Sequence, residues 1–325
     1  MTARPHDALF RSAFEPPEHA AGELRHVLPE DLVAAIDWTT LSGEPGSFID
    51  IELADRHSDI LFSAAIGRER ALIYLLLEHQ STADPIMPLR ILVYVTRIWE
   101  RCIRDAPERA LPAVIPVVIS HATGGWTAPT RMHELVRPEP SSLGGLAGLV
   151  PDFRIVVDDL AHASNEDLRA RALAVFPTVA LWLLRDGRDS EALLANLADW
   201  ASAFHAVASA PNGFEAMTRL LRYLDLVLPE RKFEQFRGKL IELAPSTEKV
   251  TMTYGERMTE EGRQEGRQEG RQEGRRALLR ELLEAKFGAL EADAAAQLAA
   301  ADDAALQRWA LRLLTATRVD DVFAD

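Results

Sequence analysis

The chain has 325 residues, of which 47% are hydrophobic and 26% charged, and its formal net charge is -14. This composition excludes an intrinsically disordered chain, and the length predicts two domains. The acidic total argues against a protein that coats nucleic acid by charge alone, but it does not exclude a local basic face. Cys102 is the single cysteine, which excludes an internal disulfide and a cysteine-based zinc cluster. Any metal must therefore be bound by carboxylates or histidines.

The apolar runs of the sequence are short. The longest, at residues 72–77 and 114–119, fall far short of the ~20 residues needed to cross a bilayer, so we expect no membrane segment. Residues 1–10 contain Arg4, His6 and Asp7 and lack the apolar stretch of a secretory signal. A cytoplasmic protein is the resulting expectation.

The first half of the sequence predicts short helices followed by a mixed α/β arrangement. Apolar residues recur at helical spacing over residues 6–36. The runs that follow are rich in Ile, Leu, Val, Phe and Tyr, and the first three predict a meander of antiparallel strands. The predicted strands lie at residues 48–53, 57–66, 71–80, 113–120 and 154–157. One broad apolar face predicts a long helix at residues 85–104, between the third and fourth strands.

The second half of the sequence is helical throughout. The 3.6-residue period predicts helices at residues 168–184, 191–208, 213–228 and 233–243. A Glu-Gly-Arg-Gln repeat then occupies residues 261–275. Each of its glycines costs a helix about 1 kcal/mol relative to Ala, and glutamates four residues apart repel each other, which favours a hinge or a weakly helical tether.

The tail beyond the repeat predicts a small helical module with Leu278, Leu282 and Phe287 in its core. Because it is short, we expect it to pack on the rest of the protein or on a second copy. The chain thus divides into four predicted segments: a nuclease-like core, a helical extension, a repeat tether and a tail module. Their predicted bounds are residues 1–160, 161–258, 259–275 and 276–325.

Two acidic residues stand out among the predicted strands. Asp59 lies on one strand, while Glu78 and Gln80 lie at the end of the next. Side chains on a strand alternate between faces, so Glu78 and Gln80 point to one side and His79 to the other. A hairpin would bring Asp59 beside Glu78. Neighbouring carboxylates repel each other unless a cation lies between them, which is typical of a Mg²⁺ site where Gln80 could orient a water molecule.

The pattern alone leaves a second interpretation of these acids open. Asp59 and Glu78 could lie at strand ends and contact solvent or an arginine such as Arg68 or Arg90. The apolar composition of both strands favours burial instead, and a buried unpaired carboxylate is costly. The sequence is compatible with both interpretations.

The runs around these acids resemble a known family. They are Ser-Asp-Ile-Leu-Phe at residues 58–62, Tyr-Leu-Leu-Leu-Glu-His-Gln-Ser at 74–81 and Met-Pro-Leu-Arg-Ile-Leu-Val-Tyr at 87–94. Further similar runs are His-Asp-Ala-Leu-Phe at 6–10, Leu-Pro-Ala-Val-Ile-Pro-Val-Val-Ile at 111–119 and the Glu-Gly-Arg-Gln repeat. Together they resemble the recombination-promoting nuclease family, also labelled a putative transposase, of the PD-(D/E)xK phosphodiesterase superfamily.

The resemblance implies a restriction-endonuclease-like mixed sheet flanked by helices, with an all-helical C-terminal half. It also implies that Asp59 and Glu78 bind Mg²⁺ or Mn²⁺. Gln80 replaces the lysine of the superfamily pattern and cannot act as a base, so it is expected to position water. The backbone carbonyl of His79 could be a further metal ligand, while its side chain is expected to pack on the opposite face.

Asp7 is a further candidate catalytic residue. The superfamily often supplies an acid from its first helix, and the resemblance therefore points to Asp7. Its residue type and position equally allow it to cap the helix that follows.

Four arginines fall on one side of the long predicted helix. Arg90, Arg97, Arg101 and Arg104 share this side, with Tyr94 among them. Guanidinium groups suit contact with phosphate, so the stripe is a candidate DNA-backbone contact. An ordinary solvated face, paired with nearby acids, is the alternative.

The sequence therefore predicts a cytoplasmic, Mg²⁺- or Mn²⁺-dependent DNA endonuclease, which the resemblance links to recombination or mobile elements. DNA is the expected partner, and a homo-oligomer could form through the helical region or the tail. The alternative is a catalytically inactive nuclease-fold protein that acts as an interaction or assembly module, because the lysine is lost and the chain is acidic.

Overall fold

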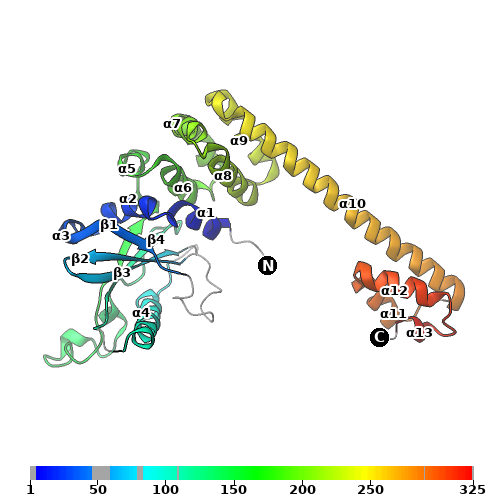
Figure 1. Cartoon of the computed structure of the whole chain (residues 1–325), viewed down its shortest axis with the longest axis horizontal. Coiled ribbons are helices and arrows are strands. Elements are labelled where there is room, and N and C mark those ends of the chain that lie inside the picture. The colour runs from blue at the N-terminus through cyan, green and yellow to red at the C-terminus, as the bar shows by residue number, and fades with distance from the viewer. Residues whose placement is uncertain (1–4, 46–58, 79–82, 108–109, 289, 324–325) are drawn as a thin grey trace. The chain divides into compact units, whose positions relative to one another are not determined.

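The computed structural model describes residues 5–45, 59–78, 83–107, 110–288 and 290–323, and for residues 77–78, 257–271 and 303 it describes the backbone alone. The chain divides into two units, Met1–Thr251 and Met252–Asp325 (Figure 1). Among the residues that the structure describes, no helix is both long enough and apolar enough to cross a bilayer.

The first unit contains a five-stranded mixed sheet, in the order β1-β2-β3-β4-β5. Its strands are β1 (Ile36–Gly43), β2 (Ile60–Ile66), β3 (Glu69–Glu78), β4 (Ala113–Ser120) and β5 (Val156–Asp159). The β1–β2 and β2–β3 pairs are antiparallel, whereas β3–β4 and β4–β5 are parallel. The mixed α/β class predicted from the sequence is therefore confirmed.

The hairpin predicted between the second and third strands is present as β2–β3. Ile66 pairs with Glu69, so two residues connect the strands, and the first of them, Gly67, has φ 63°. A positive φ at this position is typical of two-residue hairpin turns and favours glycine. This turn fixes the register of the hairpin and, with it, the position of Asp59 relative to β3.

Strand β1 was not predicted. Its sequence, IDWTTLSG, contains few apolar residues, and its burial pattern shows Ile36 and Leu41 as its buried positions. Among the described strands it pairs with β2 alone and lies at the edge of their sheet, where one partner strand supplies its hydrogen bonds. The strand predicted at residues 48–53 lies outside the described residues.

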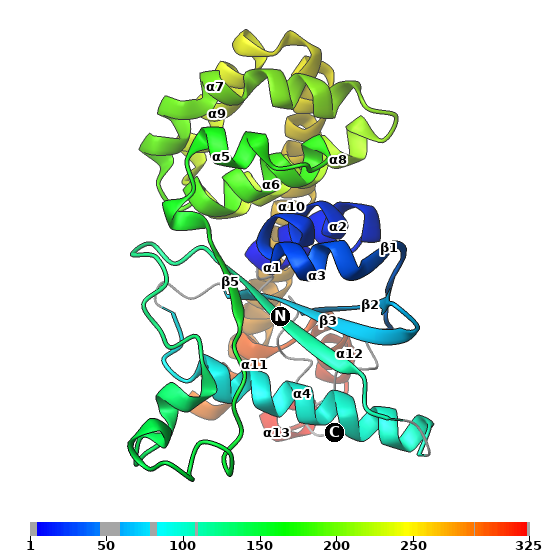
Figure 2. The ribbon, with the colours of Figure 1, turned by 90° about the vertical axis from the view of Figure 1, so that its left-hand side faces the viewer.

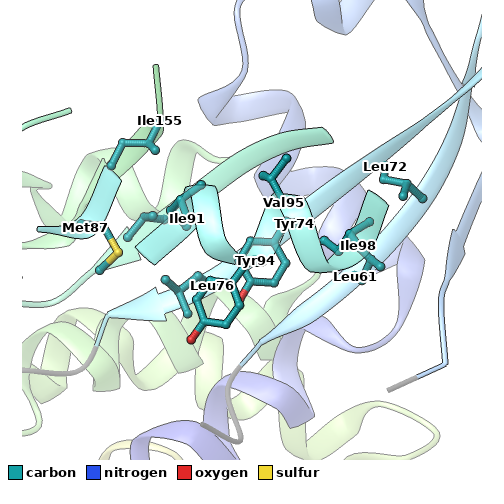
Figure 3. Packing of buried hydrophobic residues seen from close by; sticks show 11 residues of the cluster. Leu61, Leu72, Tyr74, Leu76, Met87, Ile91, Tyr94, Val95, Ile98 and Ile155 are labelled. Carbon is teal, nitrogen blue, oxygen red and sulfur yellow. The ribbon is translucent and has the colours of Figure 1, made fainter. Parts of the chain in front are cut away.

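Helices cover both faces of the sheet in the first unit, as Figure 2 shows. On one side lies α4 (Met87–Asp105), and on the other lie α1 (Pro5–Phe14), α2 (Pro17–Val27) and α3 (Glu30–Ala35). Helix α4 packs its buried face, with Ile91, Val95 and Ile98, on alternate residues of β3 and β4 (Figure 3). The predicted helix at residues 85–104 is thereby confirmed.

The helices that follow β5 form a second, all-helical layer of the first unit. They are α5 (Asn165–Ala170), α6 (Val175–Asp186), α7 (Ser190–Ser209), α8 (Gly213–Val227) and α9 (Glu230–Leu243). Their core contains the stacked rings of Trp182 and Trp200, whose centroids are 4.9 Å apart, and α1 packs against α6 and α8. Short 3-10 helices connect the elements at Met132–Leu135, Pro140–Ser142, Leu160–His162 and Pro245–Thr247.

The second unit is built on α10 (Glu248–Phe287), together with α11 (Ala292–Ala300), α12 (Asp303–Leu313) and α13 (Val319–Phe323). It has a hydrophobic core of its own, to which α10 contributes Leu279 and Leu283. The prediction that Leu278 and Leu282 lie in this core is wrong, because their exposed fractions are 57% and 46%. The buried face of α10 is displaced by one residue from the predicted face.

The repeat tract is helical rather than a hinge. Helix α10 runs through all of residues 261–275, so the structure contains no break where a weak helix was expected. The glycine cost remains, but Arg, Gln and Glu favour helix, and helix on both sides removes the need for a new nucleus. The role of the tract as a tether stays a prediction.

Candidate functional site

Asp59 directly precedes β2 and is buried, with 3% of its surface exposed. The hydroxyl of Tyr74 on β3 donates a hydrogen bond to Asp59 Oδ2 at 2.5 Å. Burial, and then the charge of the Asp59 carboxylate, raise the pKa of Tyr74, so the phenol keeps its proton and remains a donor. The structure therefore excludes the interpretation in which Asp59 is a solvated surface acid.

The hairpin register brings Asp59 and Glu78 to the same end of neighbouring strands. Ile60 pairs with Leu75, so Asp59 lies just before the paired part of β2, and Glu78 is the last residue of β3. Glu78 also pairs with Ser120, the last residue of β4. The backbone thus places Glu78 as predicted from the hairpin, while its side chain lies outside the described part of the chain.

Asp7 is presented to this end of the sheet by α1. It is the third residue of that helix, inside the first turn rather than at the capping position, and its exposed fraction is 2%. One turn further on, Arg11 Nη1 donates to the backbone carbonyl of Asp59 at 3.4 Å. Residues four apart share a helix face, so the face of α1 that carries Asp7 is turned toward Asp59.

Two histidines lie at the same end of the sheet. His121 follows β4 and is buried, and the centroid of its ring is 4.9 Å from that of His6 on α1. His6 Nδ1 lies 3.0 Å from the hydroxyl oxygen of Tyr223, which in turn donates to the carbonyl of Leu183 at 3.1 Å. Through these contacts α6 and α8 support the helix that carries Asp7.

The two arginines considered as alternative partners of Asp59 differ in position, and Arg90 is near enough to act electrostatically on Tyr74, which binds Asp59. Arg68 follows Gly67 in the hairpin turn, at the opposite end of β2 and β3. Arg90 forms an ion pair with Asp84, with a 2.8 Å separation between Nη1 and Oδ2. Gln80 and His79, including the His79 carbonyl considered as a metal ligand, lie outside the described residues.

The predicted arginine stripe divides into two kinds of residue. Arg97 and Arg104 are exposed on α4, whereas Arg90 is largely buried and paired with Asp84. Arg101 is half-buried and lies 3.5 Å from Asp105, measured from Nε to Oδ2. Tyr94, expected among the arginines, is instead buried beside Tyr74, with ring centroids 5.2 Å apart (Figure 3).

The donor atoms at this end of the sheet suit a hard cation. Asp7 and Asp59 supply buried carboxylates, and carboxylate oxygens are the ligands that Mg²⁺ prefers. Within the described part of the chain, no three His, Cys, Asp or Glu residues gather in a way that could hold a metal ion. The side chain of Glu78, the predicted second ligand, lies outside that part of the chain.

Two residues of this site were missed in the sequence. Tyr74 could have been found, because it precedes Glu78 by four residues on the same strand and therefore shares its predicted face. Arg11 had a weaker signal, since it lies one helical turn after Asp7. Its contact with Asp59 joins positions 48 residues apart, and no local pattern predicts such a contact.

The five-stranded mixed sheet with helices on both faces makes this an α/β protein. The buried carboxylates beside the strand ends form its candidate acidic site. The chain belongs to the family described as "Putative transposase, YhgA-like", whose family model matches residues 4–211. The matched region contains the whole sheet, α1, α4 and most of the helical layer up to α7. The family resemblance stated from the sequence is confirmed.

Several proteins of Escherichia coli are similar to the chain over most of its length. Recombination-promoting nuclease RpnD of strain O157:H7 is 30% identical over 79% of this chain and 95% of its own length. Recombination-promoting nuclease RpnA of strain K12 is 26% identical over 81% of this chain and 86% of its own. Inactive recombination-promoting nuclease-like protein RpnE of strain K12 is 30% identical over 81% of this chain and 84% of its own. No solved structure matches the chain significantly.

Proposed function

We propose that the protein is a cytoplasmic, metal-dependent DNA endonuclease of the PD-(D/E)xK type that hydrolyses phosphodiester bonds. The observation that carries the proposal is the buried carboxylate of Asp59, which Tyr74 binds at the strand end beside Glu78. Carboxylate oxygens at such a strand end are the ligands that Mg²⁺ prefers. Relatives named recombination-promoting nucleases support the same activity.

Asp59 and Glu78 would hold the ion, with the Asp7 carboxylate and the His79 carbonyl as further ligands. When bound, Mg²⁺ or Mn²⁺ would polarise the scissile phosphate and lower the pKa of a bound water molecule. Tyr74 holds the Asp59 carboxylate in one orientation by donating to Oδ2. Arg11 holds the backbone on which that carboxylate stands. Gln80, two residues after Glu78, is proposed to orient water.

A plasmid-cleavage assay tests the proposal. Purified protein is incubated with supercoiled DNA in Mg²⁺, in Mn²⁺ and in EDTA, and nicked and linear products are quantified. We expect Asp59→Asn and Glu78→Gln to lower the cleavage rate by at least about 100-fold, because each removes a metal-binding charge at nearly constant side-chain volume.

The matched control for this assay is Asp105→Asn. Asp105 is an exposed carboxylate on α4, so its change alters the net charge equally without touching the strand ends. We expect the control to cleave at the wild-type rate. Metal-dependent cleavage that survives in folded Asp59→Asn protein would contradict the proposal.

A second candidate function is a catalytically inactive protein that acts in assembly. The specific observation in its favour is that RpnE, named inactive, is as similar to this chain as the nuclease RpnD. Isothermal titration with Mn²⁺ separates the two candidates. A nuclease should bind the ion, and Asp59→Asn should abolish that binding. An assembly protein should show no Asp59-dependent heat, and its oligomeric state should depend on the second unit, which has its own core.

A further inference from the structure

A cavity of about 630 Å³ opens in the first unit where β4 ends. Three segments line it: the residues that follow β4, the residues that follow β5, and the junction between α6 and α7. Its polar lining includes His121 and Thr123 from the first segment, and Arg188 and Ser190 from the third. Cavities of this size hold ligands the size of a nucleotide.

The cavity lies beside the candidate acidic site. Ser120 pairs with Glu78 across β3 and β4, and His121, the next residue, forms part of the cavity wall. The same His121 ring contacts His6, which directly precedes Asp7 on α1. The cavity wall therefore lies next to the end of β3, where Glu78 stands. It is also connected to α1, because His121 in the wall contacts His6, the residue before Asp7.

The acids that line the cavity are engaged in structural contacts. Asp186 accepts hydrogen bonds from Arg185 Nε at 2.6 Å and from Trp182 Nε1 at 2.6 Å. Asp189 Oδ1 caps α7 by accepting the backbone N–H groups of Glu191 and Ala192 at 3.1 and 3.0 Å. These contacts offset the negative charge of both carboxylates locally, and an anion entering the cavity would meet less repulsion from them.

Three further polar side chains of the lining can donate hydrogen bonds. Arg188 is exposed just after the end of α6, and Thr123 and Ser190 supply hydroxyl groups. Arginine and hydroxyl side chains are the groups that most often contact nucleic-acid phosphates. The chain as a whole has a net charge of -14, so donors gathered next to the acidic site are suited to contact the phosphates of a nucleic-acid substrate.

We propose that this cavity binds a backbone phosphate of DNA that flanks the scissile bond, through Arg188, Thr123 and Ser190. The inference rests on the proposed nuclease function and names a substrate-binding subsite for it. It also gives the helical layer a function, because the α6–α7 junction supplies Arg188 and the first residue of α7 is Ser190. The family resemblance did not point to any of these residues.

The experiment measures binding separately from cleavage. The full chain is titrated against a fluorescein-labelled 20-base-pair duplex in EDTA, and anisotropy gives Kd at several salt concentrations. We expect Arg188→Gln to raise Kd about 5- to 10-fold and to lower the slope of log Kd against log salt by about 0.9, the effect of one lost phosphate contact. Ala161→Leu, which fills part of the cavity without changing charge, should also weaken binding.

The matched control is Arg231→Gln, at an exposed arginine at the start of α9 that does not line the cavity. It should leave both Kd and the salt slope unchanged, and thermal melts should confirm that all variants are folded. If Arg188→Gln binds like the wild type, the subsite is refuted while the nuclease proposal stands. If Arg188→Gln weakens binding but the wild type never cleaves DNA, the subsite is supported and the nuclease proposal fails. Absence of DNA binding by the wild type would refute both.

Discussion

Replacement of Arg171 should destabilise the first unit more than replacement of any exposed arginine. Its guanidinium lies between two buried carboxylates: Nη1 is 2.8 Å from Glu23 Oε1 and 2.7 Å from Asp158 Oδ2, while Nη2 donates to Asp158 Oδ1 at 2.9 Å. The exposed fractions of the three side chains are 2%, 0% and 9%, in the order Arg171, Glu23 and Asp158. The cluster joins α2, β5 and the segment after α5.

The magnitude follows from what Arg171→Met leaves behind. Methionine fills a similar volume but supplies no charge, so two carboxylates remain buried next to each other. Breaking a buried ion pair by removing one partner costs about 3–5 kcal/mol. The triple variant Glu23→Gln, Arg171→Met, Asp158→Asn removes the charges together, and most of the lost stability should return.

The cost should also depend on pH. Burial, and then the negative charge of Asp158, raise the pKa of Glu23 well above its ordinary value. A raised carboxyl pKa means that the folded state binds a proton more tightly than the unfolded chain. Its contribution to stability is fully present below the unfolded pKa and is lost as the pH rises through the folded pKa. Without Arg171 the Glu23 pKa rises further, so Arg171→Met should cost more at pH 8 than at pH 5.5.

Urea unfolding followed by tryptophan fluorescence measures these effects, since Trp182 and Trp200 lie in the core of the same unit. The control is Arg219→Met, because Arg219 pairs with Glu215 at the surface and such pairs contribute about 0–1 kcal/mol. A loss below about 1 kcal/mol for Arg171→Met at pH 8 would refute the argument. Equal losses at pH 5.5 and pH 8 would refute its electrostatic part.

Three further predictions address other parts of the chain. Gly22→Ala should lower the free energy of unfolding by about 1–3 kcal/mol in the same assay, because a Cβ there would lie 2.6 Å from the carbonyl oxygen of Ala172. The double variant Arg97→Glu, Arg101→Glu should reduce the slope of log Kd for DNA against log salt. An unchanged slope would show that these arginines form an ordinary solvated helix face and do not contact DNA. A chain ended at Met258 should stay folded and retain cleavage, while the number of subunits determined by light scattering, or the apparent affinity for DNA, changes. An unchanged subunit number and affinity would show that the tail does not mediate assembly.

The strands and helices that the sequence predicted correctly are those with a strong local signal. β2, β3 and β4 are apolar runs bounded by charged or turn residues, and α4 carries an apolar face through more than five turns. The missed strand β1 has no such signal, since one partner strand decides its conformation. The buried face of α10 was predicted wrongly because two neighbouring pairs of leucines, Leu278 with Leu282 and Leu279 with Leu283, are equally apolar. The packing of α11 and α12 buries the second pair.

The candidate site follows the same division. A two-residue turn at Gly67 suffices to bring Asp59 to the end of the hairpin where Glu78 lies, so this shared position follows from spacing, while the joint binding of a metal by the two acids stays a prediction. The contact between Arg11 and Asp59, and that between Glu23 and Arg171, join residues 48 and 148 positions apart. Such contacts depend on how the helices pack on the sheet, and the periodicity of the sequence does not predict this packing.

The helical layer is part of what positions the candidate acids, even though the sequence marks a change of character near residue 161. Gly22 has no side chain, so α2 can approach the backbone of Ala172 closely enough for Glu23 to reach Arg171. The structure holds the predicted core and helical extension, up to Thr251, in one unit. α1, which carries Asp7, packs on α6 and α8 and is joined to Asp59 through Arg11. A substitution that loosens α6 or α8 should therefore impair cleavage without touching any acid, because it displaces the helix that carries one of them.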